Sequence, residues 1–379
     1  MSATRRGEYT AEYEALLLVL ELGLKEWKLG FGRGFGDTPL IRTVPGGNVV
    51  ALMREIGRAK RHFDLPEDAQ VVSCYEAGRD GFWLHRFLMS KGVTNYIVDS
   101  ASIEVNRRAR HTKTDRLDTA KLLKMLIRFF AGEPGVWSVV RVPSAEDEDA
   151  RCLHRELRTL QKERARCSNR IKGLLFSQGV RIKHVGVDFL QRLKRARLWD
   201  GTPLREGMRQ RAEREYKRMR LLHGQITLLN RQRREAIRSG HGEALEKVRR
   251  MQQLRGIGDG GSWLYVMELF GWRQFDNRKQ LGAVSGLVPV PYQSGEQDRD
   301  LGISKAGNRH VRSMAIEIAW SWLRYQPDSE LSRWYLRRFG RGGPRARKIG
   351  IVALARKLLI ALWRWVEFDV LPEGAALKA

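Results

Sequence analysis

The segment from Arg151 to Arg250 constrains the fold more than any other part of the sequence. It contains 28 Lys+Arg against 10 Asp+Glu, and its leucines and isoleucines recur three or four residues apart, as on one face of an α-helix. Two long antiparallel helices, interrupted around residues 179–207, explain this pattern. A charged helix face usually serves only solvation, but a net charge of +18 repels itself and favours a polyanionic partner.

The whole chain has the same bias. Its 379 residues allow two or three domains, each with its own core, and exclude a small stapled scaffold. The formal charge of +27 points to nucleic acid. The cysteines Cys74, Cys152 and Cys167 form no CxxC pair and do not cluster with histidines, which argues against a zinc module or a disulfide framework.

The sequence predicts neither a membrane span nor a secretory signal. The apolar run from Ala15 to Leu20 ends at Glu21, and the run from Ile349 to Val366 contains three cations. The first eight residues lack the apolar core of a signal peptide. We therefore expect a cytoplasmic protein that does not bind membranes.

The first third of the chain predicts an α/β unit with the order β-β-β-α-β-α-β-α, the order found in ribonuclease-H-like nucleases. Two strands joined by a tight turn are expected within Leu16–Phe31. Further strands are expected at Leu40–Val44, Ala69–Tyr75 and Asn95–Val98, and helices at Asn48–His62, Gly81–Met89 and Lys113–Phe130.

The remaining boundaries follow from changes in composition. Residues 138–150 contain Pro143 and an acidic patch and resemble a linker. A final block opens at Leu254 and ends in helices at Arg309–Tyr325 and Gly350–Phe368, followed by a short tail that we expect to be mobile. The predicted domains are therefore 1–137, 138–250 and 251–379.

Four acidic residues form the first candidate site. Glu21 lies near the end of the first strand and Glu76 just after the fourth, while Asp115 and Asp118 share one helix face. Carboxylates from three elements suit hard divalent cations beside a phosphodiester. The alternative is structural, because acids are favoured in the first turn of any helix. That explanation does not apply to Glu21, because a carboxylate in an apolar strand lowers the stability of the fold unless it is paired or bound to metal.

A second candidate site lies between residues 286 and 312. Ser294 precedes a glycine in a predicted loop, where its hydroxyl can approach a phosphate. The cations Lys305, Arg309 and Arg312 can clamp that phosphate, and Asn308 beside them is a further candidate for nucleic-acid binding. Most Ser-Gly pairs are only turns, and neither His310 nor any other residue completes a recognisable triad.

Other cations extend the candidate nucleic-acid surface. The Leu254–Gly258 turn, with Arg255, can present backbone amides to a phosphate, or it can be a plain helix cap. Arg337, Arg338 and Arg341 lie among aromatic residues, as on single-strand or RNA surfaces, or form only a basic loop. Lys113 and Arg116 lie beside the predicted helical acids.

Several motifs together resemble a known family. Tyr-Glu-Ala-Gly at 75–78 and the run from His111 to Leu122 precede Arg-Gly-Ile-Gly, Gly-Leu-Val-Pro, Gln-Ser-Gly and Gly-Ile-Ser-Lys-Ala-Gly-Asn-Arg, in that order. This set, spread over nearly the whole chain, resembles the DEDD transposases of the IS-one-ten family of insertion sequences, the bridge-RNA-guided recombinases.

The resemblance implies a RuvC-like (RNase H-like) domain, a coiled-coil spacer and a mainly α-helical transposase domain. It places the family's metal-site acids, which would bind Mg²⁺ or Mn²⁺, on Glu21, Glu76, Asp115 and Asp118, and its nucleophile on Ser294. Glu21 departs from the commoner aspartate. The extra methylene displaces a bound metal unless the strand compensates.

The resemblance also implies a mechanism. Ser294 forms a covalent phosphoserine link to DNA, and the acids of one subunit complete the site around the serine of another. Dimers assemble into a tetramer for strand exchange. A structured noncoding bridge RNA pairs with donor and target DNA in the nucleoid of a bacterium or archaeon. Two alternatives stay open: a metal-dependent junction endonuclease that hydrolyses DNA with water, and a non-catalytic nucleic-acid-binding protein.

Overall fold

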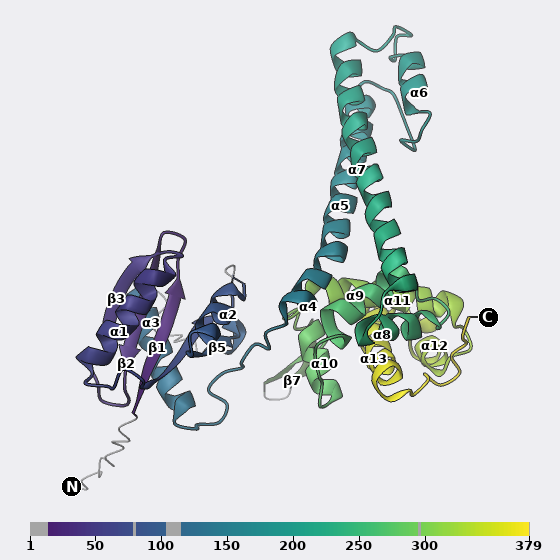
Figure 1. The fold of residues 1–379 in the computed structure, drawn as a ribbon. Helices are drawn as coiled ribbons and strands as arrows, with labels where there is room; N and C mark the ends of the chain where they lie inside the picture. The colour runs from purple at the N-terminus through teal and green to yellow at the C-terminus, as the bar shows by residue number, and fades with distance from the viewer. Residues whose placement is uncertain (1–13, 79–80, 104–114, 295–296, 379) are drawn as a thin grey trace. The chain divides into compact units, whose positions relative to one another are not determined.

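The computed structural model describes residues 14–78, 81–103, 115–294 and 297–378. The chain forms two compact units, residues 1–142 and residues 143–379 (Figure 1). In the described ranges no helix is long and apolar enough to cross a membrane.

The first unit is built on a five-stranded sheet with the order β3-β2-β1-β4-β5. Strands β1 to β3 are antiparallel neighbours, whereas β4 runs parallel to both β1 and β5. The strands span Ala15–Leu22 (β1), Glu26–Gly32 (β2), Leu40–Pro45 (β3), Gln70–Glu76 (β4) and Thr94–Val98 (β5). All five predicted strands are confirmed.

Helices cover both faces of this sheet, which explains why β1 is apolar on both faces from Ala15 to Leu20. Leu16, Leu18 and Leu20 pack toward α1 (Val49–His62) and α2 (Trp83–Ser90). Leu17 and Val19 pack toward α3 (Asp115–Phe130) on the other face. A short 3₁₀ turn, η1 (Ser100–Ser102), follows β5. The predicted helices of this unit are confirmed, and Asn48 caps α1 by accepting from the Ala51 amide at 2.9 Å.

The close packing of α3 on the sheet depends on one glycine. A Cβ added to Gly30 in β2 would lie 2.6 Å from Thr119 Cγ2 and 2.9 Å from Val19 Cγ2. Only a residue without a side chain lets the start of α3 approach the strands this closely.

The second unit opens with a helical hairpin. Helix α5 (Cys152–Phe176) packs against α7 (Glu206–Ser239), and the short α6 (Phe189–Arg195) lies in the connection between them (Figure 1). Leu157 contacts the Ile226 region, and Leu175 contacts the Ala212 region, so the pair is antiparallel as predicted. The supercoiled packing of a coiled coil remains a prediction.

The acidic part of the expected linker is helical instead. Residues Ala145–Ala150 form α4, and Ser144 and Asp147 make a reciprocal capping box at its start. The linker interpretation was wrong here because the Ser-x-x-Asp pattern at 144–147 is a helix-start signal.

The C-terminal block packs helices around one core and contains a β-hairpin. Its helices are α8 (Glu243–Gln252), α9 (Asp259–Tyr265), α10 (Arg278–Ser285), α11 (Arg309–Tyr325), α12 (Glu330–Tyr335) and α13 (Pro344–Phe368). Two π-helical turns, η3 (Val266–Phe270) and η4 (Leu336–Gly340), extend α9 and α12, and β6 (Pro289–Ser294) pairs antiparallel with β7 (Gln297–Ile303).

Two predictions for this block need correction. Helix α13 starts at Pro344, before the predicted Gly350. The tail is held against the block rather than mobile: Leu377 bridges Leu254, and Lys378 Nζ donates to the Ile257 carbonyl at 2.8 Å. These backbone and side-chain hydrogen bonds tie the tail down.

Candidate catalytic site and nucleic-acid interface

Strand register places Glu21 and Glu76 side by side. Leu20 pairs with Tyr75 in the parallel β1–β4 ladder, and one residue further along come Glu21 and Glu76. By strand alternation both positions share the sheet face of Val19 and Cys74, which is the face that α3 covers. Glu21 is half-buried and Glu76 is exposed. The two glutamates therefore occupy neighbouring positions on one sheet face, at the carboxyl edge of adjacent parallel strands.

Helix α3 brings its first turn to the same edge. Thr119 Oγ1 donates to Glu21 Oε2 at 3.2 Å, which ties the carboxylate to the start of the helix. Helix positions 115, 118, 119 and 122 lie on one stripe, and Thr119 and Leu122 on it are buried. The side chains of Asp115 and Asp118 lie outside the described structure, so only their backbone positions are placed beside Glu21.

The chemistry of this set fits a hard divalent cation. Carboxylate oxygens are the ligands that Mg²⁺ and Mn²⁺ prefer, and a hydrogen bond from Thr119 fixes one of them in the way that outer ligand-sphere contacts do. Among side chains that the structure describes, no group of three His, Cys, Asp or Glu is placed to hold a metal. Two of the four predicted ligands are outside that set, so the metal site stays a prediction.

Ser294 lies at the end of β6 rather than in a loop. It is the last residue of the strand, and its backbone pairs with Gln297 across the hairpin. Residues 295 and 296, which follow it, lie outside the described ranges, as does the Ser294 side chain. The pairing of β6 with β7 therefore fixes the backbone of the serine.

The segment after the hairpin is held by backbone contacts. Arg312 Nη1 donates to the Lys305 carbonyl at 2.9 Å, and the Lys305 amide donates to the Gly286 carbonyl at 3.1 Å. At Gly307, with φ of +101°, a Cβ would lie 2.3 Å from the Val284 carbonyl oxygen. Arg312, predicted to clamp phosphate, thus braces the loop that carries Lys305.

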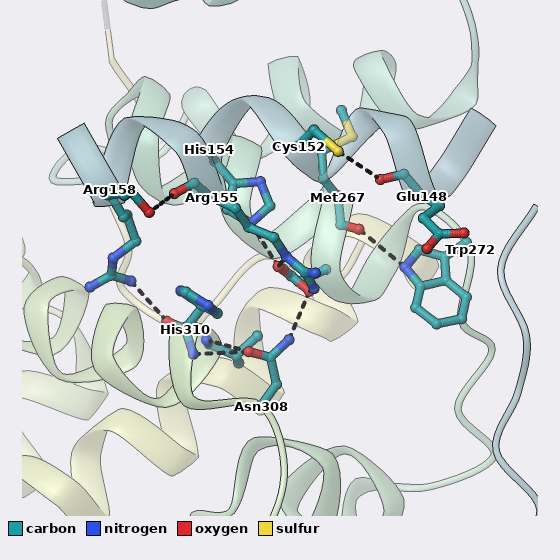
Figure 2. A network of polar contacts seen from close by, with 12 residues as sticks. Glu148, Cys152, His154, Arg155, Arg158, Met267, Trp272, Asn308 and His310 are labelled. Carbon is teal, nitrogen blue, oxygen red and sulfur yellow. Dashed lines mark hydrogen bonds and ion pairs between the residues drawn. The ribbon is translucent and has the colours of Figure 1, made fainter. Parts of the chain in front are cut away.

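Asn308 connects this loop to a buried carboxylate. Its Oδ1 caps α11 by accepting from the His310 amide at 2.9 Å, and its Nδ2 donates to Glu268 Oε2 at 2.8 Å (Figure 2). Glu268 is 1% exposed and belongs to the π-turn η3. It also accepts from Arg155 Nε and Nη2 at 2.8 and 2.9 Å and contacts His154 Nε2 at 2.7 Å.

The electrostatics of this cluster are set by its hydrogen bonds. Burial alone would raise the pKa of Glu268, but the bonds from His154 and Arg155 outweigh it and hold the pKa far below its usual range. Burial lowers the pKa of His310, whose carbonyl accepts from Arg158 Nη1 at 3.2 Å. The Glu268 carboxylate therefore joins α5, η3 and the start of α11 into one unit.

Comparison with known proteins identifies the family. The profile of the transposase family IS116/IS110/IS902 matches residues 248–333, which include η3, Ser294 and Asn308. "Putative transposase y4rJ" of Sinorhizobium fredii is 38% identical over 375 residues, 96% of this chain and 95% of that protein. The chain belongs to this transposase family. The transposase for insertion sequence element IS1111A of Coxiella burnetii is 26% identical over 74% of this chain and 73% of its own length.

The other cations predicted to bind nucleic acid differ in whether their side chains are bound within the transposase or exposed to solvent. Arg255 Nε donates to the Leu377 carbonyl at 3.1 Å, and Arg337 pairs with Glu330. Arg309 and Arg341 are exposed, and Arg338 lies over Phe339. Lys113 lies outside the described residues, as does the side chain of Arg116. The tract around Arg337 is mostly helical, because Arg337 and Arg338 belong to η4, whereas Arg341 lies in the turn between η4 and α13.

Sequence reasoning missed His154, Arg155 and Glu268. A signal was present, because Glu268 is the one charged residue in the apolar run Trp263–Phe270, the same argument that singled out Glu21. Its partners are 113 and 114 residues away in the sequence. No spacing rule could have joined them.

Proposed function

We propose that this transposase is an RNA-guided DNA recombinase that cuts and rejoins donor and target DNA through a phosphoserine on Ser294, assisted by a divalent cation on Glu21, Glu76, Asp115 and Asp118. The observation that carries the proposal is the neighbouring placement of Glu21 and Glu76 on adjacent parallel strands, beside the α3 turn that contains both aspartates. A carboxylate set of this kind suits phosphodiester chemistry.

The serine step exchanges one ester bond at the phosphorus for another. Ser294 Oγ loses its proton and attacks the scissile phosphorus; an Oγ–P bond forms, the P–O bond to one DNA fragment breaks, and the departing oxygen is protonated to a hydroxyl. A hydroxyl from the other DNA then attacks the phosphoserine, and Oγ leaves with a proton. Because one ester replaces another, rejoining needs no external energy source.

The chain's own residues have separate tasks in this scheme. A bound Mg²⁺ or Mn²⁺ would neutralise charge on the phosphate oxygens. Thr119 orients Glu21. The exposed Lys305, in the loop that Arg312 braces, and the exposed Arg309 at the start of α11 bind the phosphate backbone. By resemblance to the family, the acids of one subunit act on the serine of another within a tetramer assembled from dimers.

Recognition is delegated to a noncoding bridge RNA that pairs with donor and target DNA. Support comes from the resemblance to bridge-RNA-guided recombinases and from the composition: a net charge of +27 provides contacts to phosphates, which bind without reading sequence. Base pairing then selects the sites.

The test incubates purified protein, Mg²⁺, the noncoding RNA flanking the element, and matched donor and target DNA. We expect recombinant junctions and a covalent protein–DNA adduct that maps to Ser294. Ser294→Ala should lose the adduct and cleavage, whereas Ser304→Ala, an exposed serine ten residues away, should keep both. Cleavage by Ser294→Ala would instead indicate a metal-dependent junction endonuclease, and omission of the RNA without effect would refute RNA guidance.

A further inference from the structure

The helical hairpin of the second unit contains a cavity of about 470 Å³. Its walls come from α5, from α7 and from residues 184–187, which lie in the connection between these helices. This volume falls within the range of about 300–1,000 Å³ that is usual for small-molecule and cofactor sites. The cavity contains none of the residues assigned to strand cleavage.

The cavity is lined by cations and by no acid. Arg164 and Lys172 come from α5 and Arg220 from α7, and Arg164 Nη1 lies 3.4 Å from His223 Nδ1 across the hairpin. The nearby acids are engaged elsewhere: Glu215 binds Arg170 and Arg218, and Asp188 pairs with Arg192. The positive charge of the cavity is therefore not neutralised by its own lining and suits a phosphate.

The rest of the lining is mixed, because Ser168 and Asn169 are polar and another part of the wall is apolar. Val185, Val187 and Met219 contribute to the wall, and Val187 is 82% exposed although it is a large hydrophobic residue. The imidazoles of His184 and His223 add two planar rings. A purely electrostatic phosphate surface needs neither feature, whereas a nucleobase packs on apolar and planar groups.

We propose that this cavity binds an unpaired nucleotide of a nucleic-acid strand. Arg164, Lys172 and Arg220 hold the phosphodiester, and the base lies against Val185, Val187 and Met219. A base within a duplex is stacked and cannot enter a concave pocket, so the ligand is a single-stranded segment, loop or bulge. This site is separate from the serine chemistry and holds whether or not Ser294 is the nucleophile.

The experiment measures binding by full-length protein carrying Ser294→Ala, which excludes cleavage from the readout. Fluorescently labelled 15-nucleotide single strands, one of RNA and one of DNA, are compared with a duplex of the same length. The pocket variant is Arg164→Gln/Lys172→Gln/Arg220→Gln. The control, Arg211→Gln/Arg214→Gln/Lys217→Gln, removes the same charge from exposed positions of α7 outside the cavity.

We expect the pocket variant to weaken single-strand binding roughly tenfold or more and to lower the dependence of log K on log salt by about 0.7 for each lost phosphate contact. The control should change affinity less than threefold. Loss in either the RNA or the DNA arm supports the site, and the arm that loses more identifies the strand. Equal losses in the two variants, or an equal loss on duplex, would overturn the proposal.

A charge-neutral variant tests the position of the base. Val187→Ser removes apolar surface at an exposed residue and should leave folding intact, as checked by circular dichroism. We expect weaker single-strand binding with an unchanged salt dependence. Unchanged affinity in this variant would overturn the placement of the base in the cavity.

Discussion

Glu268 illustrates how a buried charge can organise a protein of this size. A carboxylate with 1% exposure is costly in free energy unless donors replace water. Here Arg155 supplies two donors and Asn308 a third, and His154 lies within hydrogen-bond distance. Because these residues come from α5 and from the α11 cap, one carboxylate fixes how the helical hairpin meets the C-terminal core.

Replacement of Glu268 by Gln should therefore destabilise the second unit strongly. A neutral amide leaves Arg155 without its charge partner, and breaking such a buried pair costs roughly 3 kcal/mol, the lower end of the usual range because Arg155 is partly exposed. Urea denaturation measures the loss. Glu246→Gln, at an exposed acid on α8, should change the free energy of unfolding by less than about 0.5 kcal/mol. Similar values for both variants would contradict the anchoring role.

The same residue gives a pH prediction. The pKa of Glu268 is lower in the folded protein than its ordinary value of 4.5, so its stabilising contribution is complete above pH 4.5 and is lost progressively at lower pH. The difference in unfolding free energy between the native protein and Glu268→Gln should shrink as the pH falls below 4.5. A difference that is constant from pH 7 to pH 3 would rule out this linkage.

Thr119 is a positioning residue for the proposed metal site. Its hydroxyl donates to Glu21, and Thr119→Val keeps the shape while removing that bond. Loss of such supporting contacts typically costs about 10–100-fold in metal affinity. We expect strand cleavage to need correspondingly more Mg²⁺, with nucleic-acid binding unchanged. Val in place of the exposed Thr227 on α7 is the control, and an unchanged Mg²⁺ requirement in Thr119→Val would exclude the positioning role.

At the scale of elements, two glycine-to-alanine substitutions distinguish the effect of tight packing from the effect of helix propensity. Gly30→Ala places a methyl against Thr119 and Val19 and should destabilise the first unit by about 1–3 kcal/mol. Gly224→Ala, in the middle of α7 with nothing within 4 Å of the new Cβ, should stabilise the hairpin by about 1 kcal/mol. Thermal unfolding of both variants checks the two signs. A neutral Gly30→Ala would mean that α3 is not tightly packed on β2.

The elements that were predicted correctly have a strong local sequence pattern. The elements that were missed lack such a pattern or contain residues that argue against it. Apolar periodicity was enough for β1 to β5 and for α1 to α3. The β6–β7 hairpin was missed because Pro289 and Pro291 argue against a strand; here they lie at a register shift in a two-stranded ribbon, where proline is tolerated. The start of α13 was missed although Pro344, just after two glycines, is a standard first helical residue.

At the scale of the molecule, the proposed chemistry is divided between the two units. The four acids belong to residues 1–142 and Ser294 belongs to residues 143–379. Spacing alone suggested the acids, whereas only the family resemblance singled out this serine among its neighbours. Glu268 stands out as a lone charge in an apolar run, but its partners His154, Arg155 and Asn308 could not be predicted, because folding brings them together from distant segments.

This division allows a test of whether the active site is shared between subunits. We expect Glu76→Gln and Ser294→Ala proteins to be inactive when each is assayed alone. In a mixed oligomer, the Glu76→Gln chain supplies an intact serine and the Ser294→Ala chain supplies intact acids. If the acids of one subunit act on the serine of another, mixing the two proteins restores strand cleavage to a fraction of the native rate, and the adduct forms only on the Glu76→Gln chain.

If each chain instead used its own acids and its own serine, no arrangement of the two variants would contain a complete site, and mixing would restore nothing. A chain that carries both substitutions provides the control, because it should fail to rescue either single variant. Size tags on the two chains show which one carries the DNA. An adduct formed only on the Glu76→Gln chain requires acids donated by its partner, since its own acidic set lacks one carboxylate.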